Sequence, residues 1–183
     1  FIDTLKKQHI KNLNINIAII YRNYNKNLDI EKINIIRKYC KLNKRKFIIS
    51  NNVKMAIKLD LDGVYLPSFN KSFKINNYLK KKNFIIIGSA HNLKDIRIKE
   101  KQGVDAIFLA SLFNKKKTFL GMEKFKILKK QTKTKIIALG GINESNIKKI
   151  RLLNVFGFAA IESFFLVLFI LTCSLPEKIC SYN

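Results

Sequence analysis

The sequence has few residues that interrupt helices and strands, form disulfides or bind metal ions. Its 183 residues include two prolines, seven glycines, no tryptophan, two histidines and three cysteines. So few glycines and prolines exclude a collagen-like chain or a flexible Gly/Pro-rich linker. Cys40, Cys173 and Cys180 are too few and too widely spaced for a disulfide framework or a paired-cysteine metal site, and His9 and His91 add no zinc-ligand cluster. We therefore expect a cytoplasmic protein with reduced thiols and no structural zinc.

Acidic residues are also scarce. Twelve Asp and Glu stand against 36 Lys and Arg, a formal net charge of +24. A basic surface of this size can bind a nucleic acid through its phosphates. The lysines, however, are spread over every expected helix, and no aromatic RNA-binding motif or zinc finger accompanies them. We interpret them as solvated helix faces in a chain rich in Lys, Ile and Asn, and expect no nucleic-acid partner.

Hydrophobic residues make up 48% of the chain and charged residues 26%, which is typical of a globular protein. The length predicts one domain over residues 1–183. Short apolar runs recur at residues 15–21, 46–50, 63–66, 84–88, 105–110, 135–140 and 155–161. Each run predicts a buried strand. The segments between them have apolar residues at helical spacing. Helix caps are expected at Asn51 or Asn52, at Asn92 and at Asn143.

The spacing of these strands leaves room for one helix between consecutive strands and is too long for hairpins. The sheet should therefore be parallel. Continuous apolar strands fit either an eight-stranded βα barrel or an open doubly wound sheet. Seven strands are visible, and residues 1–3 resemble the end of an eighth. We therefore predict an α/β fold of the (βα)8 TIM barrel type with a truncated first strand.

The end of the chain departs from this pattern. Residues 164–171 are all apolar, whereas the last helix of a barrel should carry a polar stripe. We expect an atypical, buried helix there, a contact between copies in a homo-oligomer, or a tail altered by an incomplete or frame-shifted reading. Residues 155–173 approach the length of a bilayer span. Because Glu162 would make insertion costly, we expect no membrane association.

The carboxyl ends of barrel strands carry the active site. The residues expected at these ends are mostly small, amide-bearing or basic, which favours an anionic phosphate over an acid–base pair. Gly140 and Gly141 are the most informative, because glycines let backbone amides approach a phosphate closely. The alternative is a plain tight turn. Together with Ile161, Glu162, Ser163 and the helix start expected after them, the two glycines predict a phosphate site.

Several motifs, taken in order, resemble those of thiamine phosphate synthase and its thiazole tautomerase relatives. They are Asp62-Gly63-Val64-Tyr65-Leu66, Ser89-x-His91, Gly103-Val104-Asp105, Ala138-Leu139-Gly140-Gly141-Ile142-Asn143 and Gly157-Phe158-Ala159-Ala160-Ile161. The resemblance implies the βα barrel. It also implies coupling of hydroxymethylpyrimidine diphosphate to a thiazole phosphate, with release of pyrophosphate and with Mg²⁺ as cofactor.

The resemblance also implies roles for single residues. Arg22, Ser89 and Lys117, the last in a lysine run at 115–117, would be the catalytic residues that face the pyrophosphate. Arg22, Tyr24 and Ser50 would contact the pyrimidine. The thiazole phosphate would lie against Gly140, Gly141 and Ser163.

The two Mg²⁺ positions of the family hold Asn51 and Asn70 in this chain. An amide oxygen can coordinate Mg²⁺ but brings no charge to the site. Two hypotheses remain open: a synthase or tautomerase that acts on phosphorylated small molecules, and a non-catalytic member that only binds them.

Other candidates have structural interpretations. Arg22 could form an ion pair at the barrel mouth, and Tyr24 and Tyr65 could be amphipathic rings at its rim. His91 fits the start of a helix better than a catalytic base. Asp62 and Asp105 precede strands, at the end opposite the expected active site, and we interpret both as structural.

Overall fold

The computed structural model describes residues 18–22, 29–115, 118–143, 145–162 and 165–170. The strands are β1 (Ala18–Tyr21), β2 (Phe47–Ser50), β3 (Gly63–Leu66), β4 (Ile85–Ala90), β5 (Ala106–Ala110), β6 (Lys135–Leu139), β7 (Gly157–Glu162) and β8 (Phe165–Ile170). The α-helices are α2 (Ile30–Leu42), α3 (Val53–Lys58), α4 (Leu93–Lys101), α5 (Gly121–Lys130) and α6 (Ile147–Ile150), and the short 3-10 helices are η1 (Phe73–Asn77) and η2 (Arg151–Leu153).

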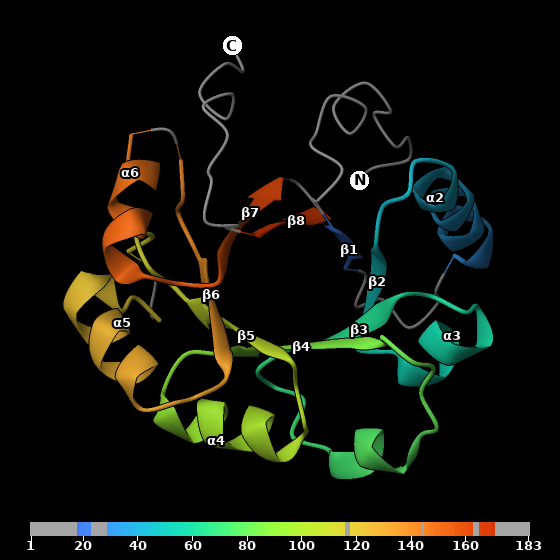
Figure 1. The fold of residues 1–183 in the computed structure, drawn as a ribbon, viewed down its shortest axis with the longest axis horizontal. Helices are drawn as coiled ribbons and strands as arrows, with labels where there is room; N and C mark the ends of the chain where they lie inside the picture. Colours follow the sequence, from blue (N-terminus) through green and yellow to red (C-terminus); the bar gives the residue numbers. More distant parts are fainter. Residues whose placement is uncertain (1–17, 23–28, 116–117, 144, 163–164, 171–183) are drawn as a thin grey trace.

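Strands β1 to β7 form a curled parallel sheet in chain order, each paired with the next. The helices lie outside this sheet, from α2 at the right of Figure 1 around to α6 at the left. The predicted parallel α/β architecture is confirmed, and the seven predicted strands coincide with β1–β7 to within a few residues. Residues 1–3, which we predicted as the end of a further strand, lie outside the described residues.

The prediction of a helix over the apolar tail is wrong. Its described residues form β8, which pairs antiparallel with both β7 and β1 and closes the barrel between them. Aromatic and β-branched residues favour a strand, and a strand hydrogen-bonded on both sides leaves no open edge. The closing strand is therefore antiparallel, unlike the eighth parallel strand of a (βα)8 barrel. Within the described ranges, none of the helices has both the length and the apolar character that a bilayer span requires.

Side chains alternate between two apolar clusters. The inner cluster lies within the barrel and includes Ile20, Ile48, Ile87, Phe108 and Ile137. The outer cluster, between the sheet and the helices, takes the intervening strand residues together with the buried faces of the helices. Side chains alternate along a strand. A residue at the end of a strand therefore faces the inner cluster when it lies an even number of residues from an inner-cluster residue of the same strand, and the outer cluster when that number is odd.

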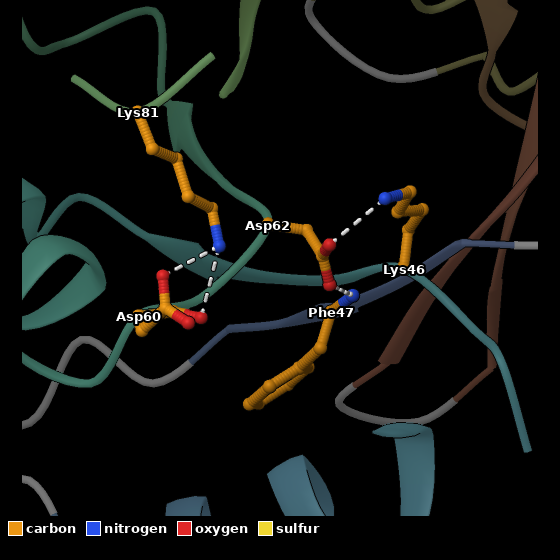
Figure 2. A network of polar contacts seen from close by, with 5 residues as sticks. All are labelled: Lys46, Phe47, Asp60, Asp62 and Lys81. Atoms are coloured by element: carbon orange, nitrogen blue, oxygen red, sulfur yellow. Dashed lines mark hydrogen bonds and ion pairs between the residues drawn. The ribbon is translucent and has the colours of Figure 1, made fainter. Parts of the chain in front are cut away.

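Aspartates join neighbouring strands at their amino ends. Asp62 Oδ2 accepts a hydrogen bond from Phe47 N at 2.9 Å, and its other oxygen pairs with Lys46 Nζ at 3.0 Å (Figure 2). Asp105 Oδ2 accepts from Ile86 N at 2.7 Å in the same way. The structural interpretation of Asp62 and Asp105 is confirmed.

Two of the three expected helix caps are confirmed. Asn52 Oδ1 accepts from Met55 N at the start of α3, and Asn92 Oδ1 accepts from Asp95 N at the start of α4, each at 2.9 Å. Asn143 does not cap α6: the helix begins after Asn146 without a side-chain cap, and Asn143 Oδ1 accepts from the amides of Ser145 and Asn146, which precede it. The caps at Asn52 and Asn92 satisfy amides that have no partner within a helix, and they fix where α3 and α4 begin after their strands.

Candidate functional site

Three hydroxyl groups come from neighbouring strands at the carboxyl end of the barrel. Tyr65 of β3 belongs to the inner cluster and pairs in register with Ser50 of β2. Its hydroxyl donates a hydrogen bond to Ser89 Oγ of β4 at 2.9 Å. Tyr65 is 4% exposed, so our interpretation of this residue as a rim ring is wrong: the ring fills the barrel and orients Ser89.

Ser50 lies on the same inner face, because Ile48 belongs to the inner cluster and Ile49 to the outer one. The residue is 3% exposed, and its Oγ has no hydrogen-bond partner among the described residues. A buried hydroxyl without a partner costs free energy unless a ligand or an ordered water satisfies it. Ser50 therefore marks a place where a polar group of a ligand can bind.

Asn51, which directly follows Ser50, contacts Asn70 of the loop after β3. Asn70 Nδ2 donates to Asn51 Oδ1 at 2.6 Å, and Asn70 Oδ1 accepts from Ser72 N at 2.9 Å. The structure thus brings the two predicted metal positions together, but both amide oxygens are already engaged and neither carries charge.

Magnesium prefers charged oxygen ligands in an octahedral arrangement. Among the described residues, no group of three or more His, Cys, Asp or Glu side chains is placed to hold a metal ion. The amide pair of Asn51 and Asn70 does not fit a resident Mg²⁺.

A cavity of about 190 Å³ opens beside this amide pair. Lys54 and Lys74 line it together with Asn51, Asn70 and Tyr78. Amide, ammonium and phenol groups all donate hydrogen bonds. The walls therefore suit an anionic group of phosphate size, and positive charge comes from side chains of the chain itself.

Gly140 and Gly141 follow β6 and pack against the loop that follows β5. A Cβ at Gly140 would lie 2.5 Å from Ser111 Oγ, and one at Gly141 would lie 2.7 Å from Asn114 N. Both glycines have a positive φ, which other residues rarely adopt. Neither donates its amide hydrogen to an acceptor among the described residues. The turn alternative thus explains why glycine is needed, and the amides remain available to an anion.

The end of β7 differs from our prediction. Ile161 and Glu162 belong to β7 and pair with Leu166 and Phe165 of the antiparallel β8. The helix that we expected to complete the phosphate site is therefore replaced by a strand, because the apolar tail pairs with open sheet edges. Ser163 lies outside the described residues.

The other predicted residues are placed as follows. Arg22 follows β1 and is half-buried, whereas Tyr24 and Lys117 lie outside the described residues. His91 Nδ1 lies 2.8 Å from Ala110 O and its backbone amide donates to Asp95, as expected of a residue at a helix start.

Lys99 and Gln102 are residues that the sequence analysis missed. Both are 0% exposed. Burial lowers the pKa of the Lys99 ammonium to about 8. The available signal was the spacing from Ile96 to Lys99, which places this lysine on the core-facing side of α4.

Comparison with known proteins agrees with this geometry. A sequence model of the family described as thiamine monophosphate synthase matches residues 8–164. The solved structure of thiamine phosphate pyrophosphorylase from Pyrococcus furiosus is similar with a TM-score of 0.63 and 26% identity, covering 75% of this chain and 69% of that one.

Two relatives illustrate the range of similarity. A thiamine-phosphate synthase of Prochlorococcus marinus subsp. pastoris is 35% identical over 120 residues, which are 63% of this chain and 34% of that protein. The chain thus spans about a third of that relative. A putative thiamine-phosphate synthase 2 of Aquifex aeolicus is 30% identical over 137 residues, covering 70% of this chain and 71% of that protein. Since the family match extends over most of the sequence, the chain belongs to the thiamine monophosphate synthase family.

Proposed function

We propose that the carboxyl end of the barrel binds phosphorylated pyrimidine and thiazole ligands and couples them. In this reaction the bond between the pyrimidine methylene carbon and the diphosphate oxygen breaks, and pyrophosphate leaves with the electron pair. The thiazole nitrogen then donates its lone pair to the methylene carbon and forms the new carbon–nitrogen bond. The observation that carries the proposal is the buried hydroxyl of Ser50, which has no partner within the described part of the chain.

Each part of the site has a role in this proposal. Ser50 hydrogen-bonds the pyrimidine, and Ser89, oriented by Tyr65, faces the reacting carbon. The amides of Gly140 and Gly141 bind the thiazole phosphate, as glycine-rich turns do elsewhere. Positioning two reactants in this way converts a bimolecular reaction into one within a single complex.

The leaving pyrophosphate needs positive charge near its oxygens. Asn51 and Asn70 are poor ligands for a divalent cation, whereas Lys54 and Lys74 line the adjacent cavity. Fixed cations near developing negative charge lower the barrier of such a reaction. We therefore assign the stabilisation of pyrophosphate to lysine side chains.

A second candidate is a member that binds these ligands without coupling them. It is favoured by the direct hydrogen bond between Asn51 and Asn70, which occupies the position of the family's metal-binding acids. In that case the barrel serves as a carrier or sensor of phosphorylated thiamine precursors.

Incubation of the full chain with hydroxymethylpyrimidine diphosphate and thiazole phosphate, with and without Mg²⁺, tests the proposal. We expect pyrophosphate release together with the coupled product detected by mass spectrometry, and a smaller yield from Ser50→Ala. Calorimetry with each ligand alone separates the two candidates: binding without product supports the carrier, and no binding of either ligand contradicts both.

A further inference from the structure

The side chain of Lys99 crosses the outer face of the barrel next to Gly88 of β4. Lys99 lies on α4, three residues after the buried Ile96. A Cβ at Gly88 of β4 would lie 2.7 Å from Lys99 Cδ and 2.9 Å from its Cγ. The absence of a side chain at Gly88 therefore leaves the space through which the lysine reaches the carboxyl end of β3.

The ammonium group at the end of this side chain is fully hydrogen-bonded. Lys99 Nζ donates to Pro67 O at 2.8 Å, to Asn70 O at 2.7 Å and to Gln102 Oε1 at 2.9 Å. An ammonium has three hydrogens, and each has an acceptor here. A buried charge is tolerated when it is solvated in this way by protein groups.

Gln102 extends the same network. Its Nε2 donates to Asn70 O at 3.1 Å and to Ser72 O at 2.9 Å. The loop of residues 67–72, which we call the β3 loop, is thus held through its carbonyls by two side chains from the α4 region. The side chain of Asn70 in this loop donates from Nδ2 to Asn51 Oδ1.

We propose that Lys99 and Gln102 are positioning residues: they hold the backbone carbonyls of the β3 loop, so that Asn70 is set against Asn51 at the edge of the ligand site. A divalent cation between two carboxylates would join the same two loops directly. In this chain Lys99 holds one of them, the β3 loop, and the hydrogen bond from Asn70 to Asn51 joins the two. The relevance to ligands rests on the proposed function, whereas the effect on the loop does not.

Hydrogen–deuterium exchange on the full chain tests the effect on the loop. In Lys99→Met the shape is nearly kept, but Pro67 O, Asn70 O and Gln102 Oε1 lose the hydrogen bonds from the ammonium. We expect the amides of Asn70 and Ser72 to exchange about 10- to 100-fold faster, while β6 and α5 keep their protection. Lys94→Met is the matched control, since Lys94 is an exposed lysine of the same helix, and should leave every segment unchanged.

Gln102→Met keeps the proposal testable if Lys99→Met does not fold. It removes the bonds to Asn70 O and Ser72 O and one acceptor of the Lys99 ammonium, which keeps its bonds to Pro67 O and Asn70 O. We therefore expect a smaller increase confined to the same loop. Addition of Mg²⁺ to the unmodified chain should not change exchange in the loop. Equal acceleration in all segments of Gln102→Met, or none in the β3 loop, would overturn the proposal.

The consequence for the ligand site has a separate readout. Where coupling is detected, Lys99→Met should raise KM for the pyrimidine diphosphate more than it lowers kcat, because the edge of the site is displaced while the reacting groups remain. A loosened loop with unchanged KM contradicts positioning. If the unmodified chain binds no ligand, the proposed function fails, while the exchange result still decides the role of Lys99.

Discussion

At the amino ends of the strands, Asp62 and Asp105 each accept a hydrogen bond from a backbone amide of the preceding strand, and Lys46 pairs with Asp62. At the carboxyl ends, the hydroxyl of Ser50 and the backbone amides of Gly140 and Gly141 have no hydrogen-bond acceptor in the described part of the chain. The first arrangement stabilises the fold, because strand starts are joined by charged hydrogen bonds. The second arrangement leaves polar groups that can hydrogen-bond a ligand. Substitutions should therefore affect stability at one end and ligand binding at the other.

The largest effect is expected at Gly140, because this residue serves both the stability of the fold and the proposed binding of the thiazole phosphate. Alanine there would adopt a φ of +105° and would place a Cβ 2.5 Å from Ser111 Oγ. Backbone strain and overpacking together should lower the free energy of unfolding by about 2–4 kcal/mol. Gly140→Ala should also weaken binding of thiazole phosphate, because the turn that presents the amides is displaced. Denaturant unfolding and calorimetry measure the two effects.

Gly103→Ala is the control for this substitution. Gly103 also has a positive φ, but the nearest atom to an added Cβ is Asn76 Oδ1 at 4.0 Å. It should show only the strain of the left-handed backbone, about 1 kcal/mol, with unchanged ligand affinity. Equal losses of stability in both variants would contradict the close packing of the β5 and β6 loops.

The next largest effect is a loss of stability from a substitution at the amino ends of the strands. Asp105→Ala leaves Ile86 N without its acceptor, and loss of a hydrogen bond to a charged group should cost about 1.5–3 kcal/mol of unfolding free energy. Ligand affinity should stay the same. Asp60→Asn is the comparison. It removes the exposed ion pair of Asp60 with Lys81 (Figure 2) but keeps a residue type that tolerates the φ of 48° at this position. The melting temperature of this variant should match that of the unmodified chain. A large loss of affinity in Asp105→Ala would remove the distinction between the two ends.

The sequence was sufficient to predict the seven parallel strands and the cap at Asn92, and to narrow the cap of α3 to Asn51 or Asn52, because apolar periodicity and capping are local signals. It was insufficient for β8. A short, wholly apolar run fits a helix or a strand equally well, and the choice depended on the open edges of β1 and β7, which only the assembled sheet presents.

For the site, strand ends were predictable but connections across the barrel were not. Ser50 and Asn51 stand directly after an apolar run, whereas the bond from Tyr65 to Ser89 depends on which face each residue occupies. Lys99 was treated as one more solvated lysine. Its burial depends on the missing side chain at Gly88, a relation between a helix and a strand that has no signature within either segment.

A third prediction concerns the amide pair. In the double variant Asn51→Asp, Asn70→Asp, two carboxylates would face each other where one amide now donates to the other. We expect the variant to be less stable without metal and to gain about 1.4–2 kcal/mol of unfolding free energy at Mg²⁺ concentrations ten- to thirtyfold above the dissociation constant of the variant for Mg²⁺. The unmodified chain should show no such shift in thermal unfolding. Equal stabilisation of both proteins by Mg²⁺ would mean that the metal binds elsewhere or that the amides do accept it.

The smallest change in stability is expected at Ser50, and its sign is opposite to that of Asp105→Ala. Ser50→Ala removes a buried hydroxyl that has no partner among the described residues, so the free energy of unfolding should stay constant or rise by up to about 1 kcal/mol. Affinity for the pyrimidine ligand should fall about tenfold, the effect of losing one hydrogen bond worth about 1.4 kcal/mol. Ser145→Ala, at an exposed loop position, controls for the loss of a hydroxyl outside the barrel. Thermal unfolding and calorimetry on the same samples provide the measurement. A Ser50→Ala protein that is less stable and binds as well as before would mean that the hydroxyl serves the fold, and the contrast between the two ends of the barrel would no longer hold.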